Sequence, residues 1–210
     1  MKKIILIFIL SFFIFISTIH SSLPLSGKLI IIDAGHGSKD VGTSYNDILE
    51  KDLNLNISKK IEEQLIMNGA SVILVREGDY DLSSPNSKKR KRSDFNNRIE
   101  YINNSNADIY LYIHINYLND KKYNGAQVFY NKDKNKKLAN TIQMELNKIT
   151  TPRAIKKTPN VYMYDKLKIK GVLIECGFLS NYNERNKLIN DDYQTLLSKM
   201  IVDGIIKYFT

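Results

Sequence analysis

Two kinds of hydrophobic pattern alternate along this chain. Short, nearly unbroken apolar runs predict buried β-strands, and they cover residues Leu29 to Ile32, Val72 to Val75, Ile109 to Ile115, Ala126 to Tyr130, Val161 to Tyr164 and Val172 to Ile174. Blocks with apolar residues three or four positions apart predict amphipathic helices, and they cover residues Asp52 to Met67, Asp94 to Asn103, Leu138 to Ile149 and Tyr193 to Tyr208. Apolar strands that alternate with helices indicate an α/β fold, a mostly parallel twisted sheet of about six strands with helices on both faces.

The first residues differ in composition from the rest of the chain. Lys2 and Lys3 precede an uncharged run from Ile4 to Ile19, which is the arrangement of an export signal. This run is short for a membrane span of roughly 20 residues, and the residues just after it lack a clean small-x-small cleavage site. We therefore expect residues 1–24 to be a signal peptide or an N-terminal membrane anchor, and residues 25–210 to be one exported catalytic domain, either secreted or membrane-anchored.

The net charge of the chain favours anionic binding partners. Lys and Arg total 31 against 22 Asp and Glu, a net charge of +9, which suits an anionic partner such as nucleic acid, a membrane or an acidic polymer. Five consecutive cations lie at Lys88 to Arg92 in a polar segment, Ser83 to Ser93, that predicts a long loop. Export separates the chain from nucleic acid, so we expect a solvated loop, with contact to anionic glycan or lipid head groups as the alternative.

Cysteine usage excludes two classes of site. Cys176 is the only cysteine, so neither an internal disulfide nor a cysteine-rich zinc finger is available. We expect Cys176 to be a small buried apolar residue, the alternative being an accessible thiol open to oxidation beside Glu175.

The candidate chemistry lies where strands end, because ligand sites in parallel sheets lie beyond the carboxyl ends of the strands. His36 follows the first strand between two glycines, His114 lies near the end of the third, and Glu50 begins the first helix. Two imidazoles and a carboxylate form an open zinc site that leaves one position for another ligand. Cobalt, nickel and manganese also fit such a set, and Asp47 or Asp52 could replace Glu50 in it.

A further carboxylate, Glu175, ends the late strand. Its apolar neighbours, Leu173, Ile174 and Phe178, are expected to raise its pKa, as a general acid at neutral pH requires. We therefore predict that Glu175 is the catalytic acid and base, with a helix cap or an ion-pair partner as the alternative.

These residues stand in motifs that resemble a known family. The motifs are Ile31-Ile32-Asp33-Ala34-Gly35-His36-Gly37, Glu50 before its helix, Tyr112-Ile113-His114-Ile115-Asn116 and Leu173-Ile174-Glu175-Cys176-Gly177-Phe178-Leu179-Ser180-Asn181. Over residues 28–209 the chain resembles the zinc-dependent N-acetylmuramoyl-L-alanine amidases of bacterial cell-wall remodelling. The resemblance implies that His36, Glu50 and His114 bind Zn²⁺, that Glu175 is the acid/base and that Asn116 contacts substrate. It also implies that Arg98, with Asn103 or Asn104, braces the strand ends.

Weaker likeness points to the sporulation branch of that family. It lies in Arg76 to Leu82, Gly125 to Tyr130 and Ile205 to Phe209, and implies action on spore-cortex peptidoglycan, at the cell wall or in the forespore intermembrane space. There the amidase strips peptides so that a deacetylase can form muramic-δ-lactam, and an accessory or activating protein is expected. An exported zinc peptidase or deacylase of other specificity, and a catalytically silent wall-binding or partner-binding module, remain the alternatives.

Overall fold

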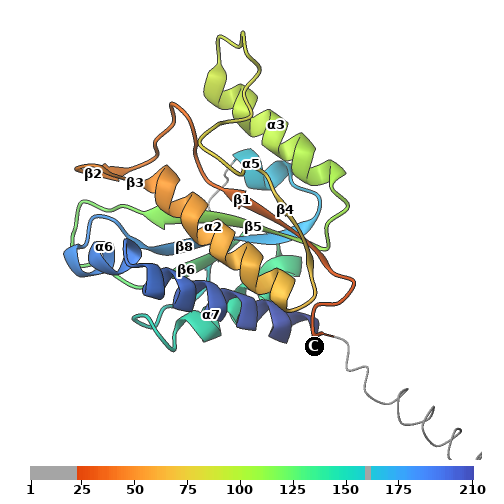
Figure 1. The fold of residues 1–210 in the computed structure, drawn as a ribbon, viewed down its shortest axis with the longest axis vertical. Helices are drawn as coiled ribbons and strands as arrows, with labels where there is room; N and C mark the ends of the chain where they lie inside the picture. The colour runs from red at the N-terminus through yellow and green to blue at the C-terminus, as the bar shows by residue number, and fades with distance from the viewer. Residues whose placement is uncertain (1–22, 159–161) are drawn as a thin grey trace, which may run out of the picture.

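The structure is a computed structural model that describes residues 23–158 and 162–210. Its centre is a six-stranded sheet (Figure 1), in the order β4 (Ser71–Leu74), β1 (Leu29–Ala34), β5 (Ile109–Asn116), β8 (Lys170–Phe178), β6 (Gln127–Tyr130) and β7 (Lys156–Lys157). The first four of these strands run parallel, and β6 runs antiparallel to β8. The predicted α/β fold with a mostly parallel sheet of about six strands is confirmed.

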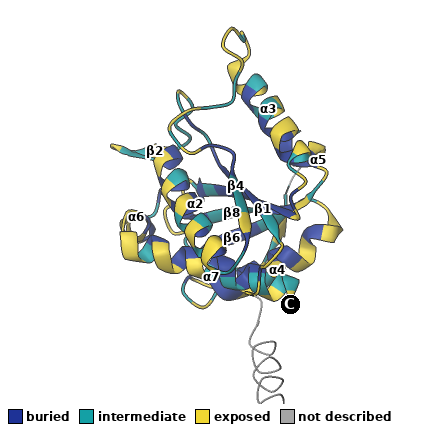
Figure 2. Cartoon of the chain, turned by 45° about the vertical axis from the view of Figure 1, so that its right-hand side comes forward, coloured by how far each residue is buried: buried dark blue, intermediate teal, exposed yellow. Residues whose placement is uncertain are grey.

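Helices cover both faces of the sheet. One face carries α2 (Glu50–Met67), α4 (Lys136–Leu146) and α7 (Asp191–Phe209), and the other carries α3 (Arg90–Asn104) and α5 (Tyr162–Lys166). Figure 2 shows exposed residues on the outer sides of these helices and buried residues in the strands between them. Along β1, Ile30 and Ile32 join the first core and Ile31 joins the second, because successive side chains of a strand point to opposite faces.

Short elements complete the chain at the rims of the sheet. They are the two-stranded ladder of β2 (Ser44–Tyr45) and β3 (Ile48–Leu49), the 3₁₀ turn η1 (Asp133–Asn135) and helix α6 (Tyr182–Leu188). The β2–β3 ladder directly precedes α2, so it delivers the chain to the first residue of that helix.

Two predicted elements were wrong. Val161 to Tyr164 was expected to be a strand, but Tyr162 begins the helix α5, whose Met163 and Tyr164 pack under the sheet beside Tyr112. Short apolar runs suit a buried helix as well as a strand, and the sequence offered nothing to separate them. Helix α3 begins at Arg90, so part of the basic run predicted as loop is helical; the apolar periodicity of this helix starts only later.

The amino ends of the parallel strands form the opposite rim from the carboxyl ends. The backbone N–H of Leu25 donates to the Asn68 carbonyl just beyond α2 (2.9 Å), and the Lys28 ammonium lies 4.9 Å over the Phe209 ring. The chain therefore enters the described domain beside its C-terminus (Figure 1). The export segment predicted over residues 1–24 lies almost entirely outside the described residues. No helix within residues 23–158 and 162–210 is both long and apolar enough to span a bilayer.

Candidate active site

Three predicted ligands meet at the carboxyl ends of the strands. His36 follows β1, Glu50 is the first residue of α2, and His114 lies in β5. The Glu50 Oε1 atom is 3.2 Å from Nε2 of His36 and 2.9 Å from Nδ1 of His114. Glu50 is buried, whereas the imidazoles keep 17% and 14% of their side-chain surface exposed. The three groups are grouped closely enough to hold one metal ion.

Three cationic side chains donate hydrogen bonds to the backbone around His36. His36 has a left-handed backbone with φ of 64°, which an L-residue adopts only where its surroundings enforce it. Buried Arg98 of α3 donates to the carbonyls of Ala34 (3.1 Å) and His36 (2.8 Å). Buried Arg76 donates to the carbonyls of Ala34 (2.8 Å) and Gly35 (3.1 Å).

Lys51 completes this support, since its ammonium donates to the Ser38 carbonyl (3.0 Å) and to Asp79 (2.6 Å). Arg98 also pairs with Asp33, at the end of β1, and with Asp94. The resemblance had implied that Arg98 braces the strand ends, and these contacts do so. Asn103 instead binds the backbone of Lys166 and Lys168 near α5.

Glycines at two positions make room for the ligands. A Cβ at Gly35 would lie 2.2 Å from Nε2 of His114, so the ring of His114 rests directly on this backbone. A Cβ at Gly42 would lie 2.6 Å from Oε2 of Glu50, and Gly42 itself has a φ of 70°. Any side chain at these positions would displace a predicted ligand, His114 or Glu50.

Glu50, rather than its acidic neighbours, is the carboxylate of the cluster. Its Oε2 accepts hydrogen bonds from the Thr43 backbone N–H (2.8 Å) and hydroxyl (2.9 Å), which leaves Oε1 turned to the imidazoles. Asp47 and Asp52 are exposed and lie outside the cluster. The alternative in which either replaces Glu50 is therefore not supported.

Electrostatics couple these groups. Burial favours the neutral form of Glu50, but the two imidazoles that face it hold the pKa of its carboxyl well below the ordinary value. Burial lowers the pKa of His36, yet Asp40 and Glu50 outweigh this and raise it to about 9. Burial lowers the pKa of His114. Asp40, whose Oδ2 lies 3.1 Å from Nδ1 of His36, has a pKa held low by that imidazole.

Glu175 faces the same cluster from β8. It is the register partner of His114, so the two side chains leave neighbouring strands on the same face. Burial, together with the charge of Glu50, raises the pKa of Glu175 to about 8. Its Oε2 is buried and finds no hydrogen-bond partner in the part of the chain that the structure describes.

Cys176 points the other way along β8. It is buried in the core under α4 and α7, as the period of two requires for a residue next to Glu175. Burial raises the pKa of its thiol. The prediction of a small buried apolar residue is confirmed, and an accessible thiol is not.

A cleft of about 420 Å³ opens over the cluster; we call it the strand-end cleft. Its lining residues are His36, Asp40, Gly42, Thr43, Glu50, Lys91, His114, Ile115, Asn116, Tyr117 and Glu175. Asn116 ends β5 at this cleft, where it was predicted to contact substrate. The cleft thus contains all five predicted site residues.

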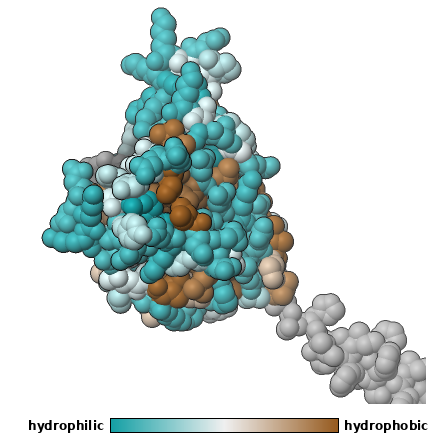
Figure 3. All heavy atoms as spheres, turned by 60° about the vertical axis from the view of Figure 1, so that its left-hand side comes forward, coloured by the Kyte–Doolittle hydropathy of each residue, from teal (hydrophilic) through white to brown (hydrophobic). Residues whose placement is uncertain are grey.

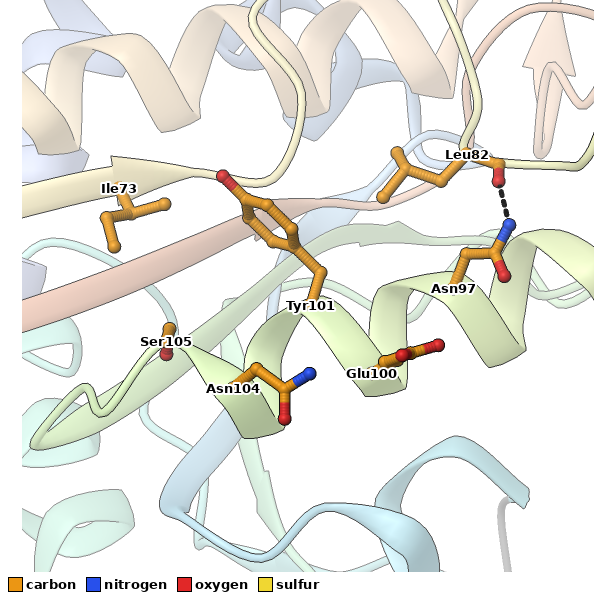
Figure 4. A pocket seen from close by; sticks show the side chains of 7 residues that line it. All are labelled: Ile73, Leu82, Asn97, Glu100, Tyr101, Asn104 and Ser105. Atoms are coloured by element: carbon orange, nitrogen blue, oxygen red, sulfur yellow. Dashed lines mark hydrogen bonds between the residues drawn. The ribbon is translucent and has the colours of Figure 1, made fainter.

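A second hollow lies away from this chemistry. It measures about 530 Å³ and lies between α3 and the edge strand β4, where Tyr101 projects between Ile73 and Leu82 (Figure 4). Asn97 donates to the Leu82 carbonyl at its rim. Glu100 is its one carboxylate, and none of the predicted ligands lines it.

The sequence did not identify Asp40, Thr43 or Lys91 as lining residues of the strand-end cleft. Asp40 and Thr43 lie between Gly37 and Leu49, whose course depends on left-handed residues and the short β2–β3 ladder. Asp40 follows His36 by four residues, but outside a helix this spacing has no fixed geometry. Lys91 stands within the basic run Lys88 to Arg92, which was predicted to be a solvated loop and not part of the site.

Comparisons with known proteins agree with this architecture. The Amidase_3 family model, described as N-acetylmuramoyl-L-alanine amidase, matches residues 30–207. The germination-specific N-acetylmuramoyl-L-alanine amidase of Bacillus subtilis is 40% identical over 196 residues, covering 90% of this chain and 83% of that protein. The CwlD amidase from Clostridioides difficile, solved in complex with the GerS lipoprotein, superposes with a TM-score of 0.83 at 39% identity, covering 87% of this chain and 98% of that one. The catalytic domain of CwlV, an N-acetylmuramoyl-L-alanine amidase from Bacillus (Paenibacillus) polymyxa, gives a TM-score of 0.76 at 29% identity, covering 86% and 97%.

Proposed function

Because this chain belongs to the N-acetylmuramoyl-L-alanine amidase family, we propose that it is a zinc-dependent enzyme that hydrolyses the amide between N-acetylmuramic acid and L-alanine in peptidoglycan. The observation that carries the proposal is the convergence of His36, Glu50 and His114 on one point, with Glu175 beside them in the same cleft. In this reading residues 25–210 are the catalytic domain.

The donor atoms fit zinc. Two imidazole nitrogens lie 3.2 Å and 2.9 Å from one carboxylate oxygen, and all the donor atoms lie within 4.8 Å of one another, close enough to bind one ion. Two histidines and a glutamate are an established catalytic zinc set with one position open. His36, Glu50 and His114 would hold the ion, and when bound it supplies Lewis acidity to the substrate carbonyl.

Glu175 is the group that moves protons in this proposal. Burial raises the pKa of its carboxyl, and in this proposal Glu175 takes a proton from the attacking water and gives it to the departing alanine nitrogen as the amide C–N bond breaks. Its Oε2 makes no hydrogen bond within the described residues, so this oxygen is free for substrate. Asn116, at the end of β5, offers an amide to the same substrate.

The narrower biological role rests on similarity. The relative from Bacillus subtilis is named as germination-specific, and we propose that this chain likewise acts on spore-cortex peptidoglycan, as the first step towards muramic-δ-lactam completed by a deacetylase. Export to the cell wall or forespore intermembrane space, through residues 1–24 as signal or anchor, belongs to the same proposal. An accessory protein is also proposed, since the CwlD structure was solved with a lipoprotein.

Mass spectrometry of purified peptidoglycan after incubation with the zinc-loaded protein tests the activity. The expected products are free stem peptides with N-terminal alanine and intact glycan strands that bear lactyl carboxylates. Shortened peptides still attached to glycan would indicate a zinc peptidase, and new reducing ends would indicate a glycosidase. No product from either cortex or vegetative wall would support a silent binding module.

The cortex assignment needs its own measurement. Spores from cells that lack the protein should contain no muramic-δ-lactam and should germinate poorly. Normal lactam content in these spores would contradict the cortex role and leave a general wall amidase.

A further inference from the structure

The last three residues of the basic run, Arg90, Lys91 and Arg92, form the start of α3 and contact different parts of the protein. Successive residues of a helix point about 100° apart, and here the two arginines are engaged by the protein. Arg90 donates to Asp81 (2.6 Å) and to the Ser38 hydroxyl (3.0 Å). The Arg92 guanidinium lies 3.2 Å over the Tyr162 ring. These contacts fix the first turn of the helix.

Lys91, between the arginines, is directed to the strand-end cleft. Its ammonium lies 3.3 Å from Asp40, and 63% of its side chain is exposed. It lines the cleft together with His36 and Glu175. Among the described residues that line this cleft, Lys91 is the one with a permanent positive charge.

The charge of Lys91 is only partly compensated. Asp40 is shared, since it also lies 3.1 Å from His36. The first turn of α3 contains no acidic residue, so the positive end of the helix dipole adds to the charge of Lys91. Figure 3 shows one face of the molecule, which is mostly hydrophilic with separate apolar areas.

We infer that Lys91 is a specificity-determining residue that binds a carboxylate of the peptide attached to the glycan. This inference rests on the proposed function. In peptidoglycan the scissile amide joins lactyl and L-alanine, and the next residue is D-glutamate linked through its side chain, so its α-carboxylate stays free close to the reacting bond. An ammonium at the edge of the cleft stabilises such an anion by a charge-assisted hydrogen bond.

Two matched substrates test the assignment. They are short glycan fragments with stem peptides whose D-glutamate α-carboxylate is either free or amidated. The full chain, loaded with zinc, should cleave the free acid with a kcat/KM about two- to fivefold above that of the amide, mainly through KM, because an exposed ion pair contributes about 0.2–1 kcal/mol. The K91Q variant should lose this preference by slowing only on the acid, with unchanged zinc content, and K91R should keep it.

Lys88 gives the matched control, because it belongs to the same basic run but is exposed outside the cleft. The K88Q variant should retain the preference of the parent for the free acid. Equal kcat/KM on both substrates in the parent, or equal losses on both in K91Q, would overturn the inference and leave the Lys91 ammonium with its contacts to Asp40 and to the Phe95 ring. Turnover of neither substrate by the parent would instead overturn the proposed function, and the inference with it.

Discussion

At the residue scale, substitution of one titratable residue, Glu175, is expected to remove catalysis without removing metal binding. Glu175 lies in the strand-end cleft but outside the group His36, Glu50 and His114. We predict that E175Q keeps its zinc and loses hydrolysis by about 10²- to 10⁴-fold, because the amide retains the shape but cannot transfer a proton. Metal analysis and rates on the same preparation check this. The exposed Glu100 provides the control, since E100Q should retain both properties.

The same residue predicts a pH dependence of stability. Burial and the charge of Glu50 raise the pKa of Glu175 to about 8 from an ordinary 4.5. Between these pH values the folded, metal-free protein keeps a proton that the unfolded chain has lost, so its free energy of unfolding falls as the pH rises. E175Q removes this contribution.

Urea unfolding in the presence of a chelator measures that effect. The stability of E175Q relative to the parent should increase between pH 5 and pH 8, by about 2–4 kcal/mol, since each pKa unit corresponds to 1.4 kcal/mol. A difference that stays constant across this pH range would show that Glu175 titrates normally.

Asp40 supplies a third test among single residues. Its Oδ2 lies 3.1 Å from Nδ1 of His36, while Nε2 of the same ring faces Glu50. A carboxylate behind a metal-binding imidazole fixes its tautomer and orientation, and its removal commonly costs 10- to 100-fold in affinity. We expect D40A to lose zinc to a chelator at about 10- to 100-fold lower chelator concentration, whereas D47A, at an exposed site of the same loop, should match the parent.

At the element scale, the parts that were predictable are those whose pattern is local. β1, β5, β8 and α2 follow from apolar runs and periodicity, and the ends of the predicted strands put His36, His114 and Glu175 at one rim of the sheet. The loop after Gly37 and the helix α5 were not predictable. The loop depends on left-handed residues such as Ser38 and on hydrogen bonds to Glu50, and α5 depends on burial against the sheet.

Arg98 connects two elements, and this connection can be tested. It lies in α3, pairs with Asp33 at the end of β1 and donates to the carbonyls of Ala34 and His36. Loss of one partner of a buried ion pair costs about 3–5 kcal/mol, because the other charge stays buried without compensation. We expect that cost for R98M in chemical unfolding.

Arg92 is the matched arginine on the same helix. It is exposed and stacks on Tyr162, a contact worth about 0.5–1 kcal/mol. R92M should therefore lose no more than that, and zinc affinity should fall in R98M alone. Similar losses in the two variants would mean that the His36 loop does not depend on Arg98.

At the scale of the whole molecule, the parallel sheet separates the chain entry from the site. Glu50 begins α2 at the strand-end cleft, and the last turn of this 18-residue helix lies near Leu25 at the opposite rim. A rise of 1.5 Å per residue gives a separation of about 27 Å. The alternation of strands and helices predicted a site at the carboxyl ends of the strands, whereas no local pattern identified a protein partner.

Metal binding should stabilise the whole domain rather than the cleft alone. The three proposed ligands come from the loop after β1, from α2 and from β5, so only the folded chain presents all of them together. Binding to the folded state adds about 4 kcal/mol when free zinc is 1,000 times the Kd. For a domain of this size each kcal/mol moves Tm by about 2–4 °C, so we expect Tm to be about 8–16 °C higher with zinc than with a chelator.

E175Q should show the same shift because it keeps every proposed ligand, and H114A should show almost none. A full shift in H114A would mean that zinc binds elsewhere, and the assignment of His36, Glu50 and His114 as its site would be wrong.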